Sequence, residues 1–194
     1  MADQKISAMP AASTLDGTEV IPLVQSGANV KAALSAIRAF ANAYGAWSDS
    51  TDQTGNIAAG TAVTFNTTDI SDGILLEDGS KFKVPNDGIY NLQFSAQFKN
   101  TANEQHDATI WFRVNGVDLP NSATQITVPA RKTANIYGYS VAAWNLFFDL
   151  NANDYVQLIW VPTNVAVTLE HLPASLSPAY PAIPSIILTM QQVS

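Results

Sequence analysis

The clearest pattern of hydrophobic and polar positions lies between Val141 and Trp160, which read VAAWNLFFDLNANDYVQLIW. Two apolar runs flank a polar turn at residues 151–154, and this pattern predicts two β-strands. A strand with one solvated face should alternate apolar and polar residues, because successive side chains leave on opposite faces. The first strand is instead apolar on both faces, with Ala142, Trp144, Leu146, Phe148 and Leu150 on one and Val141, Ala143 and Phe147 on the other. Such a strand needs cover on both sides, and a second copy of the chain is a natural source of it.

Short strands and turns follow one another from residue 61 to the end of the chain. Residues 88–99 alternate cleanly, with Tyr90, Leu92, Phe94, Ala96 and Phe98 expected to point inward. Asp78-Gly79 and Asn115-Gly116 are typical turns. We expect further strands around Trp47 and at residues 62–66, 74–77, 81–84, 108–114, 122–128, 165–172 and 185–193, and a proline-rich loop at 173–184. Regular short strands without helical periodicity favour an antiparallel β-sandwich or jelly roll.

Residues 1–44 have a different organisation and are predicted to form a module of their own, before a head of residues 45–194. A short strand at residues 19–25, a turn at Ser26-Gly27-Ala28 and a return strand at 29–32 predict a hairpin, in which Pro22 indicates an edge strand. Apolar residues from Leu34 to Ala41 then follow at helical spacing and predict a helix. A unit of about 40 residues is usually too small to be stable alone, so we interpret it as an attachment module that docks on a larger partner. Its expected docking residues are Ile6, Pro10, Val20, Ile21, Leu23, Val24, Ile37 and Phe40.

Composition narrows the classes of function. Of the 194 residues, 47% are hydrophobic, which supplies a core, and 13% are charged, against roughly 25% in ordinary soluble proteins. The net charge of −7 and the lack of a basic cluster argue against nucleic-acid binding. The chain has no cysteine, which excludes thiolate chemistry and disulfides. We find neither a secretion signal nor a run of ~18 apolar residues, and we expect a protein made in the cytoplasm and not inserted in a membrane.

No catalytic site is legible in the sequence, and we expect neither an enzyme nor a cofactor. His106 and His171 have no second histidine nearby, and no Gly-x-Ser-x-Gly motif is present. Residues 149–160 resemble a calcium-binding loop only at their start, because the sixth residue is not glycine and the twelfth is Trp160. Asp49, Asp52, Asp69 and Asp72 could still hold a structural calcium ion between copies of the chain.

Aromatic residues give the candidate contact surfaces. Trp144 and Trp160 share faces with apolar neighbours and are expected in the core, whereas Trp111 either caps the outer sheet or meets a neighbouring copy. Tyr137, Tyr139 and Tyr180 lie among uncharged polar residues in two expected loops, a composition typical of surfaces that bind sugars or proteins. The alternative is that these loops simply close one end of the sandwich.

Two stretches of the chain resemble known families. The opening KISAMPAASTLDGTEVIPLVQSGANVKAALSAI resembles a short N-terminal module of bacteriophage virion proteins, especially tail and fibre components. Met9 stands where leucine is commoner, and the residues that fit are Lys5, Ile6, Pro10, Gly17, Glu19, Pro22, Val24, Gln25 and Gly27. The rest resembles a jelly-roll domain of phage structural proteins, itself similar to trimeric heads of the complement and tumour necrosis factor type. Its landmarks are FKVPNDGIYNLQFSAQ, with the shared Gly88 and Tyr90, and WFRVNGVDLPNSATQITV, VAAWNLFFDLNANDYVQLIW and PAIPSIILTMQQV. Residues 130–140 are longer and more aromatic than this family pattern, which leaves that loop unassigned.

The resemblance implies a homotrimeric virion protein of mainly β structure, with an antiparallel jelly-roll head behind a hairpin-plus-helix module. Residues 1–44 would attach it to another virion protein. The expected trimer interface comprises Val141, Ala143, Phe147, Trp111, Tyr155 and Ile159. As a tail fibre the protein would bind a host surface glycan or protein. The alternative is a capsid decoration or head-fibre protein that recognises no receptor.

Overall fold

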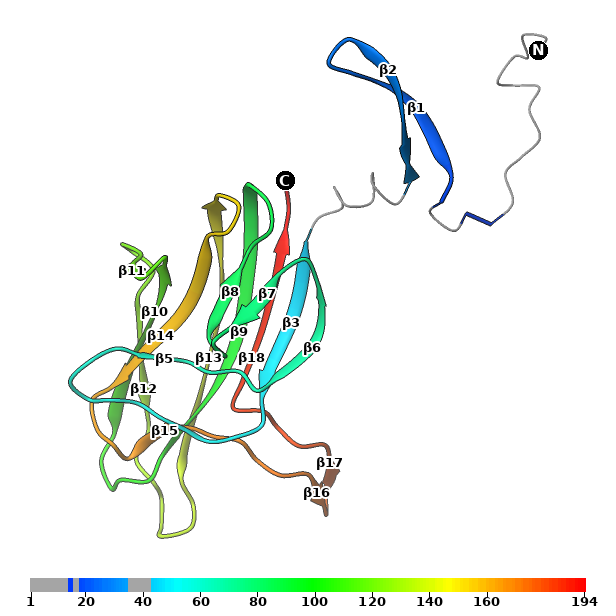
Figure 1. Cartoon of the computed structure of the whole chain (residues 1–194). Helices are drawn as coiled ribbons and strands as arrows, with labels where there is room; N and C mark the ends of the chain where they lie inside the picture. The colour runs from blue at the N-terminus through cyan, green and yellow to red at the C-terminus, as the bar shows by residue number, and fades with distance from the viewer. Residues whose placement is uncertain (1–13, 16–17, 35–42) are drawn as a thin grey trace. The chain divides into compact units, whose positions relative to one another are not determined.

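The computed structural model describes residues 14–15, 18–34 and 43–194 of the chain (Figure 1). The chain divides into two compact units, Met1–Ala41 and Asn42–Ser194, and we call the second unit the head. Tyr44, which we had assigned to the first module, is the first residue of the first strand of the head. The fold is mainly β, as predicted, and its sheets are antiparallel.

The described part of the first unit is a β-hairpin. Strand β1 (Val20–Gln25) pairs with β2 (Ala28–Ala33), which confirms the predicted hairpin. Ser26 and Gly27 join them with φ angles of 52° and 79°, the left-handed values that a type I′ turn requires. Val20, Ile21 and Val24 are exposed and Leu23 is half-buried. The predicted helix lies outside the described residues except for Leu34, as do Ile6, Pro10, Ile37 and Phe40.

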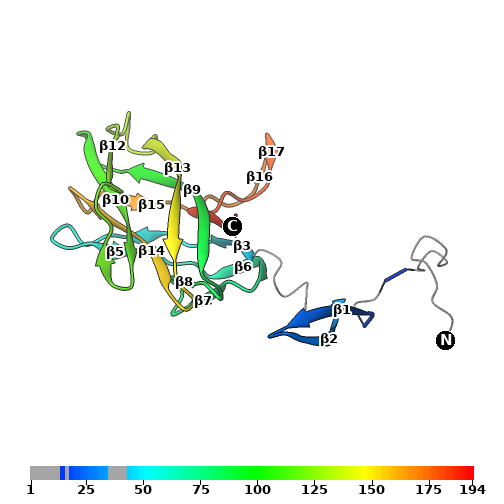
Figure 2. The same ribbon diagram turned by 90° about the horizontal axis from the view of Figure 1, so that it is seen from above.

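The head is built from two antiparallel sheets that face each other (Figure 2). In the first, the β9 sheet, the strands lie in the order β13 (Gly138–Leu150), β9 (Gly88–Asn100), β18 (Ile186–Gln192), β3 (Tyr44–Asp49) and β6 (Thr67–Asp72). Strands β15 (Val167–Leu169) and β4 (Gln53–Thr54) continue this sheet beside the end of β9.

The second sheet, the β10 sheet, has β10 (His106–Val114) and β14 (Tyr155–Pro162) at its centre. Strands β11 (Val117–Asp118) and β12 (Thr124–Val128) pair with β10, and β5 (Thr61–Ala62) and β8 (Lys81–Lys83) pair with β14. Strand β7 (Leu75–Glu77) pairs with β8.

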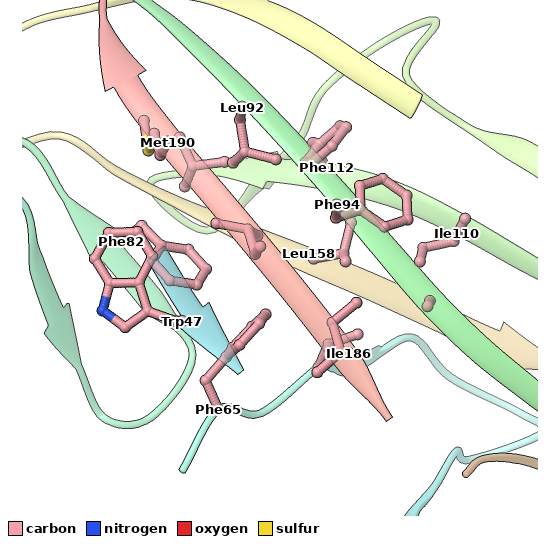
Figure 3. Close-up of a cluster of buried hydrophobic side chains, with 14 of the residues drawn as sticks. Trp47, Phe65, Phe82, Leu92, Phe94, Ile110, Phe112, Leu158, Ile186 and Met190 are labelled. Carbon is pink, nitrogen blue, oxygen red and sulfur yellow. The ribbon is translucent and has the colours of Figure 1, made fainter. Parts of the chain in front are cut away.

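The core lies between these sheets and is rich in aromatic rings (Figure 3). The five residues predicted to point inward from β9 are all buried. Ring contacts cross from one sheet to the other: the centroids of Phe94 and Phe112 are 5.8 Å apart, and those of Phe98 and Trp160 are 5.7 Å apart. Trp160 is therefore a core residue, as predicted, and Trp144 packs at the edge of the core against Phe94.

The two strands of residues 141–160 do not form a hairpin. Strand β13 pairs with β9 and β14 pairs with β10, so the turn at residues 151–154 crosses between the sheets. The outer side of β14 is covered by the chain itself. Ile159 pairs with Ala62 of β5 and has no exposed surface, and a Cβ atom on Gly60 would lie 2.7 Å from its Cγ2 atom. The prediction that Ile159 meets a sister subunit is therefore wrong.

Two further differences from the sequence prediction concern exposed segments. Strand β6 (TTDISD) was not foreseen, because an edge strand with every residue exposed leaves no hydrophobic pattern. Residues 173–184, expected to be a loop, contain a small hairpin of β16 (Ser175–Leu176) and β17 (Ala179–Tyr180).

The head begins and ends at the same end. Tyr44 of β3 pairs with Gln191 of β18, near the C-terminus, in the upper part of Figure 1. The loops at residues 101–105 and 129–137 and the β16–β17 hairpin lie at the opposite end. We call this opposite end the far end of the head.

Candidate functional site

The outward face of the β9 sheet carries no charged side chain along the central parts of its four main strands. Cross-strand partners share a face, so the strand register fixes which side chains lie on it. We call it the charge-free face. It comprises Val141, Ala143, Asn145 and Phe147 of β13; Asn91, Gln93, Ser95 and Gln97 of β9; Ile187, Thr189 and Gln191 of β18; and Tyr44, Ala46 and Ser48 of β3. Charged side chains lie at its margins: Lys99 on β9, Asp149 on β13 and Asp72 on the edge strand β6.

The outward face of the β10 sheet has the opposite character. It carries Asp107 and Arg113 on β10 and Lys81 and Lys83 on β8. Three ion pairs lie along it, with N–O distances of 2.7 Å for Lys81–Asp78, 3.1 Å for Lys83–Glu77 and 2.7 Å for Arg113–Asp118. This second face looks like the ordinary solvated surface of a soluble protein, and the charge-free face does not.

Strand β13 exposes apolar side chains and a long edge together. It pairs with β9 along its whole length, and no strand in the described part of the chain pairs with its other edge. Strand β12 approaches that edge only near its start, where the Ser140 hydroxyl donates to the carbonyl of Thr127 at 2.9 Å. Val141 is 56% exposed and Phe147 is 60% exposed. The predicted second apolar side of this strand is therefore present, and the described residues leave it exposed.

A hollow of about 360 Å³ lies on the charge-free face beside β13. Its walls come from β3, β6, β9 and β18: Tyr44, Gly45, Ile70, Asn91, Gln93, Thr189, Met190 and Gln191. Asn91 is only 5% exposed and accepts a hydrogen bond from Gln93 Nε2 at 3.1 Å. Its Nδ2 atom is buried without a partner in the described part of the chain. A buried donor of this kind is costly unless an acceptor reaches it.

The structure divides the predicted trimer residues between two faces. Val141, Ala143 and Phe147 lie together on the charge-free face. Trp111 and Tyr155 lie on the outward side of the β10 sheet, where Trp111 Nε1 donates to Asp118 at 2.8 Å and the Lys81 ammonium lies 5.3 Å from the Tyr155 ring. The two outward faces point away from each other, so one interface cannot contain both sets.

Sequence reasoning missed the residues of β3 and β18 on the charge-free face, including Tyr44 and Ile187. The uncharged polar run Asn91, Gln93, Ser95 and Gln97 was visible in the sequence and marked this face.

Two of the three candidate recognition tyrosines come together at the far end of the head. Tyr139 is the cross-strand partner of Lys99, and the Lys99 ammonium lies 5.3 Å from the Tyr137 ring. Lys99 also forms a largely buried ion pair with Glu170. Burial raises the pKa of Tyr139, and the nearby Glu170 carboxylate raises it further. Tyr180 is half-exposed on β17, in the separate β16–β17 hairpin.

Two of the four aspartates considered as calcium ligands have hydrogen-bond partners within the chain. Asp49 is buried and accepts hydrogen bonds from the Thr51 backbone N–H at 2.8 Å and from Asn66 Nδ2 at 3.2 Å. Asp52 accepts from the backbone N–H of His171 at 2.8 Å. Asp69 and Asp72 lie on β6. Asp49 therefore works as a cap for its own turn within a single copy.

Metal-binding groups, membrane-spanning helices and related proteins give little further information on the function of this chain. Among the residues that the structure describes, no group of three or more His, Cys, Asp or Glu side chains is placed to hold a metal ion. The described residues also contain no helix with the length and apolar character that crossing a membrane demands. Comparison with protein-family models and with curated proteins finds no match for this chain.

Proposed function

We propose that this chain is a structural bacteriophage virion protein whose head assembles into a homotrimer through the charge-free face. The single observation that carries the proposal is that face itself, with Val141 and Phe147 exposed on a strand whose outer edge pairs with none of the described strands. A soluble protein rarely leaves a contiguous apolar surface beside an open strand edge unless a partner covers it. Its lack of charge favours a partner surface that is also uncharged, and a second copy has one.

The strand order supports a jelly-roll head. The main strands form the series β3-β18-β9-β13 in one sheet and β8-β14-β10-β12 in the other. These are eight antiparallel strands in two packed sheets, and every step along the chain between them crosses to the other sheet except the step from β10 to β12, which pair with each other. This arrangement fits a jelly roll. This order agrees with the resemblance of the sequence to trimeric jelly-roll heads.

The two ends of the head support a fibre-like attachment. The first strand of the head begins at Tyr44, at the end opposite to the loop that carries Tyr137 and to the start of β13, which carries Tyr139. An anchor at one end leaves the far end free to contact a host surface glycan or protein. A trimer presents three identical far ends, and this multivalency raises avidity without a deep pocket.

The oligomeric state is the first test. The purified full-length chain is analysed by sedimentation equilibrium over a wide range of concentrations. We expect the mass of three chains. A chain that sediments as a monomer even at high concentration contradicts the proposal.

The second test locates the protein on the phage particle. Antibodies against the head are applied to intact particles of the phage that encodes the chain, and the label is located by electron microscopy. We expect label on the tail or its fibres. Label spread over the shell supports a capsid decoration protein instead, and particles without any label contradict a virion function.

A further inference from the structure

We infer that the Phe147 ring of one copy occupies the hollow lined by Tyr44, Ile70 and Asn91 in the next copy of the trimer. The inference rests on the proposed function, because it names the contact that would hold the head together. The exposed Phe147 ring and the hollow lie on the same face of the head. We interpret them as the two sides of one contact between copies.

The ring adjoins the Asn91 wall of the hollow, and the opposite wall of the hollow lies farther across the face. Phe147 is on β13, at one margin, whereas Tyr44 is three strands away on β3 and Ile70 lies beyond it on β6. With neighbouring strands about 4.8 Å apart, Phe147 and Tyr44 are separated by about 14 Å. A contact between two different patches is heterologous, and it produces either a closed ring of copies or an open filament.

The register indicates a closed ring. Phe147 is the partner of Asn91, Asn91 of Gln191, and Gln191 of Tyr44, so ring and hollow lie in one row across the sheet. A rotation about an axis parallel to the strands therefore brings the ring of one copy to the hollow of the next without a shift along that axis. A contact without such a shift forms a closed trimer when the rotation is one third of a turn, whereas a shift would build a helical filament.

The chemistry of the hollow suits this occupant. Tyr44, Ile70 and Met190 offer apolar walls to an incoming ring. The unpartnered Asn91 Nδ2 needs an acceptor, and the open edge of β13 brings backbone carbonyl oxygens along with Phe147. The side chains of this row from Phe147 to Tyr44 are uncharged, and Asp72, the partner of Tyr44 on the edge strand β6, lies exposed at the margin. A contact over the uncharged part of the row avoids the cost of burying ions.

The absence of cysteine makes cross-linking a clean test. Phe147→Cys is combined with Ile70→Cys in one double variant and with Tyr44→Cys in another, because these two residues line the hollow. The purified full-length proteins are oxidised and run on a non-reducing gel. We expect at least one double variant to give covalent trimers as its largest product and the single variants to stay uncross-linked, since a disulfide needs Cα atoms within about 7 Å.

The control pair is Val141→Cys with Ile70→Cys. Val141 is as exposed as Phe147 but lies six residues along the strand, about 20 Å away, so we expect no cross-link.

If the protein sediments as a trimer but neither double variant forms a cross-link, this inference is contradicted and the proposed trimer still stands. A chain that sediments as a monomer contradicts both. Covalent dimers from Phe147→Cys alone, or products longer than three chains, contradict the closed heterologous ring.

Discussion

At the scale of single residues, Phe147 and Phe148 are chain neighbours with opposite environments. The Phe148 ring is 4% exposed and its centroid lies 5.1 Å from that of Phe112 in the other sheet. Phe147 points out of the charge-free face. One side chain therefore stabilises the fold of a single copy, and the other is available for contact between copies.

These environments predict different outcomes for the two residues. Phe147→Asp should leave the head folded but convert the trimer into monomers, because it places a charge in the contact. Adding Phe148→Ala to this monomeric variant should lower the free energy of unfolding by about 3–5 kcal/mol, the usual cost of removing a buried ring. Circular dichroism in urea and sedimentation velocity measure both effects. A Phe147→Asp protein that remains trimeric would show that this residue lies outside the interface.

Gly138 is a second residue with a specific steric role. A Cβ atom there would lie 1.8 Å from the carbonyl oxygen of Pro129, and that oxygen belongs to the backbone and cannot move cheaply. We expect Gly138→Ala to lower the urea midpoint of unfolding clearly. Gly116→Ala is the control: its Cβ would meet only the Tyr155 hydroxyl at 3.5 Å, and its φ of 82° costs about 1–2 kcal/mol. Equal losses in the two variants would contradict the steric argument.

Residue patterns predicted much of the inside of the head and only part of its surface. Alternation along residues 88–99 identified the buried side chains because a strand has only two faces, and a core residue must be apolar. The same alternation placed Ile159 on an outer face and could not reveal that residues 60–62 cover that face. That cover comes from a distant part of the sequence, which a local pattern does not encode.

At the scale of elements, strands and tight turns were predicted better than their partners. Asn115-Gly116 and Asp78-Gly79 adopt left-handed φ angles and join paired strands, as turn chemistry indicates. The turn at residues 151–154 looks similar in sequence but crosses between the sheets. Turn residues set the local backbone, whereas long-range packing decides which strands pair.

Asp154 holds this crossing turn and gives it a pH dependence. Its carboxylate accepts from Asn115 Nδ2 at 2.7 Å and from the backbone N–H of Asn151 at 2.8 Å, and the first of these bonds contributes most to lowering the pKa of Asp154. Because the pKa is lower in the folded than in the unfolded chain, the stabilisation is complete above the unfolded value of about 3.9 and is lost as the pH falls through the folded value.

We expect wild type and Asp154→Asn to differ in how their stability changes at acidic pH. Wild type should lose stability as the pH falls through the folded pKa of Asp154, and Asp154→Asn should start less stable at neutral pH and lose less on acidification. Urea unfolding measured across about pH 2–6 checks this difference. If both proteins lose the same stability as the pH falls, Asp154 is not the cause of this pH dependence.

At the scale of the whole molecule, the head should trimerise without the N-terminal module. Residues 44–194 contain every strand of the two sheets and the whole charge-free face. We expect this fragment to sediment as a trimer with nearly the same dissociation constant at about 0.05 M and 1 M salt, because screening acts on charges and the central side chains of this face from β13 to β3 carry none. Strong dissociation at high salt would indicate an ionic interface elsewhere on the head.

The order of strands in the β9 sheet also determines when a newly made chain can fold. Strand β18 is the last strand of the sequence, yet it lies in the middle of its sheet, between β9 and β3. Until residues 186–192 have left the ribosome, the sheet has a gap at its centre and two additional open edges, which favour aggregation. A premature stop codon before Ile186 would therefore abolish the head rather than shorten it.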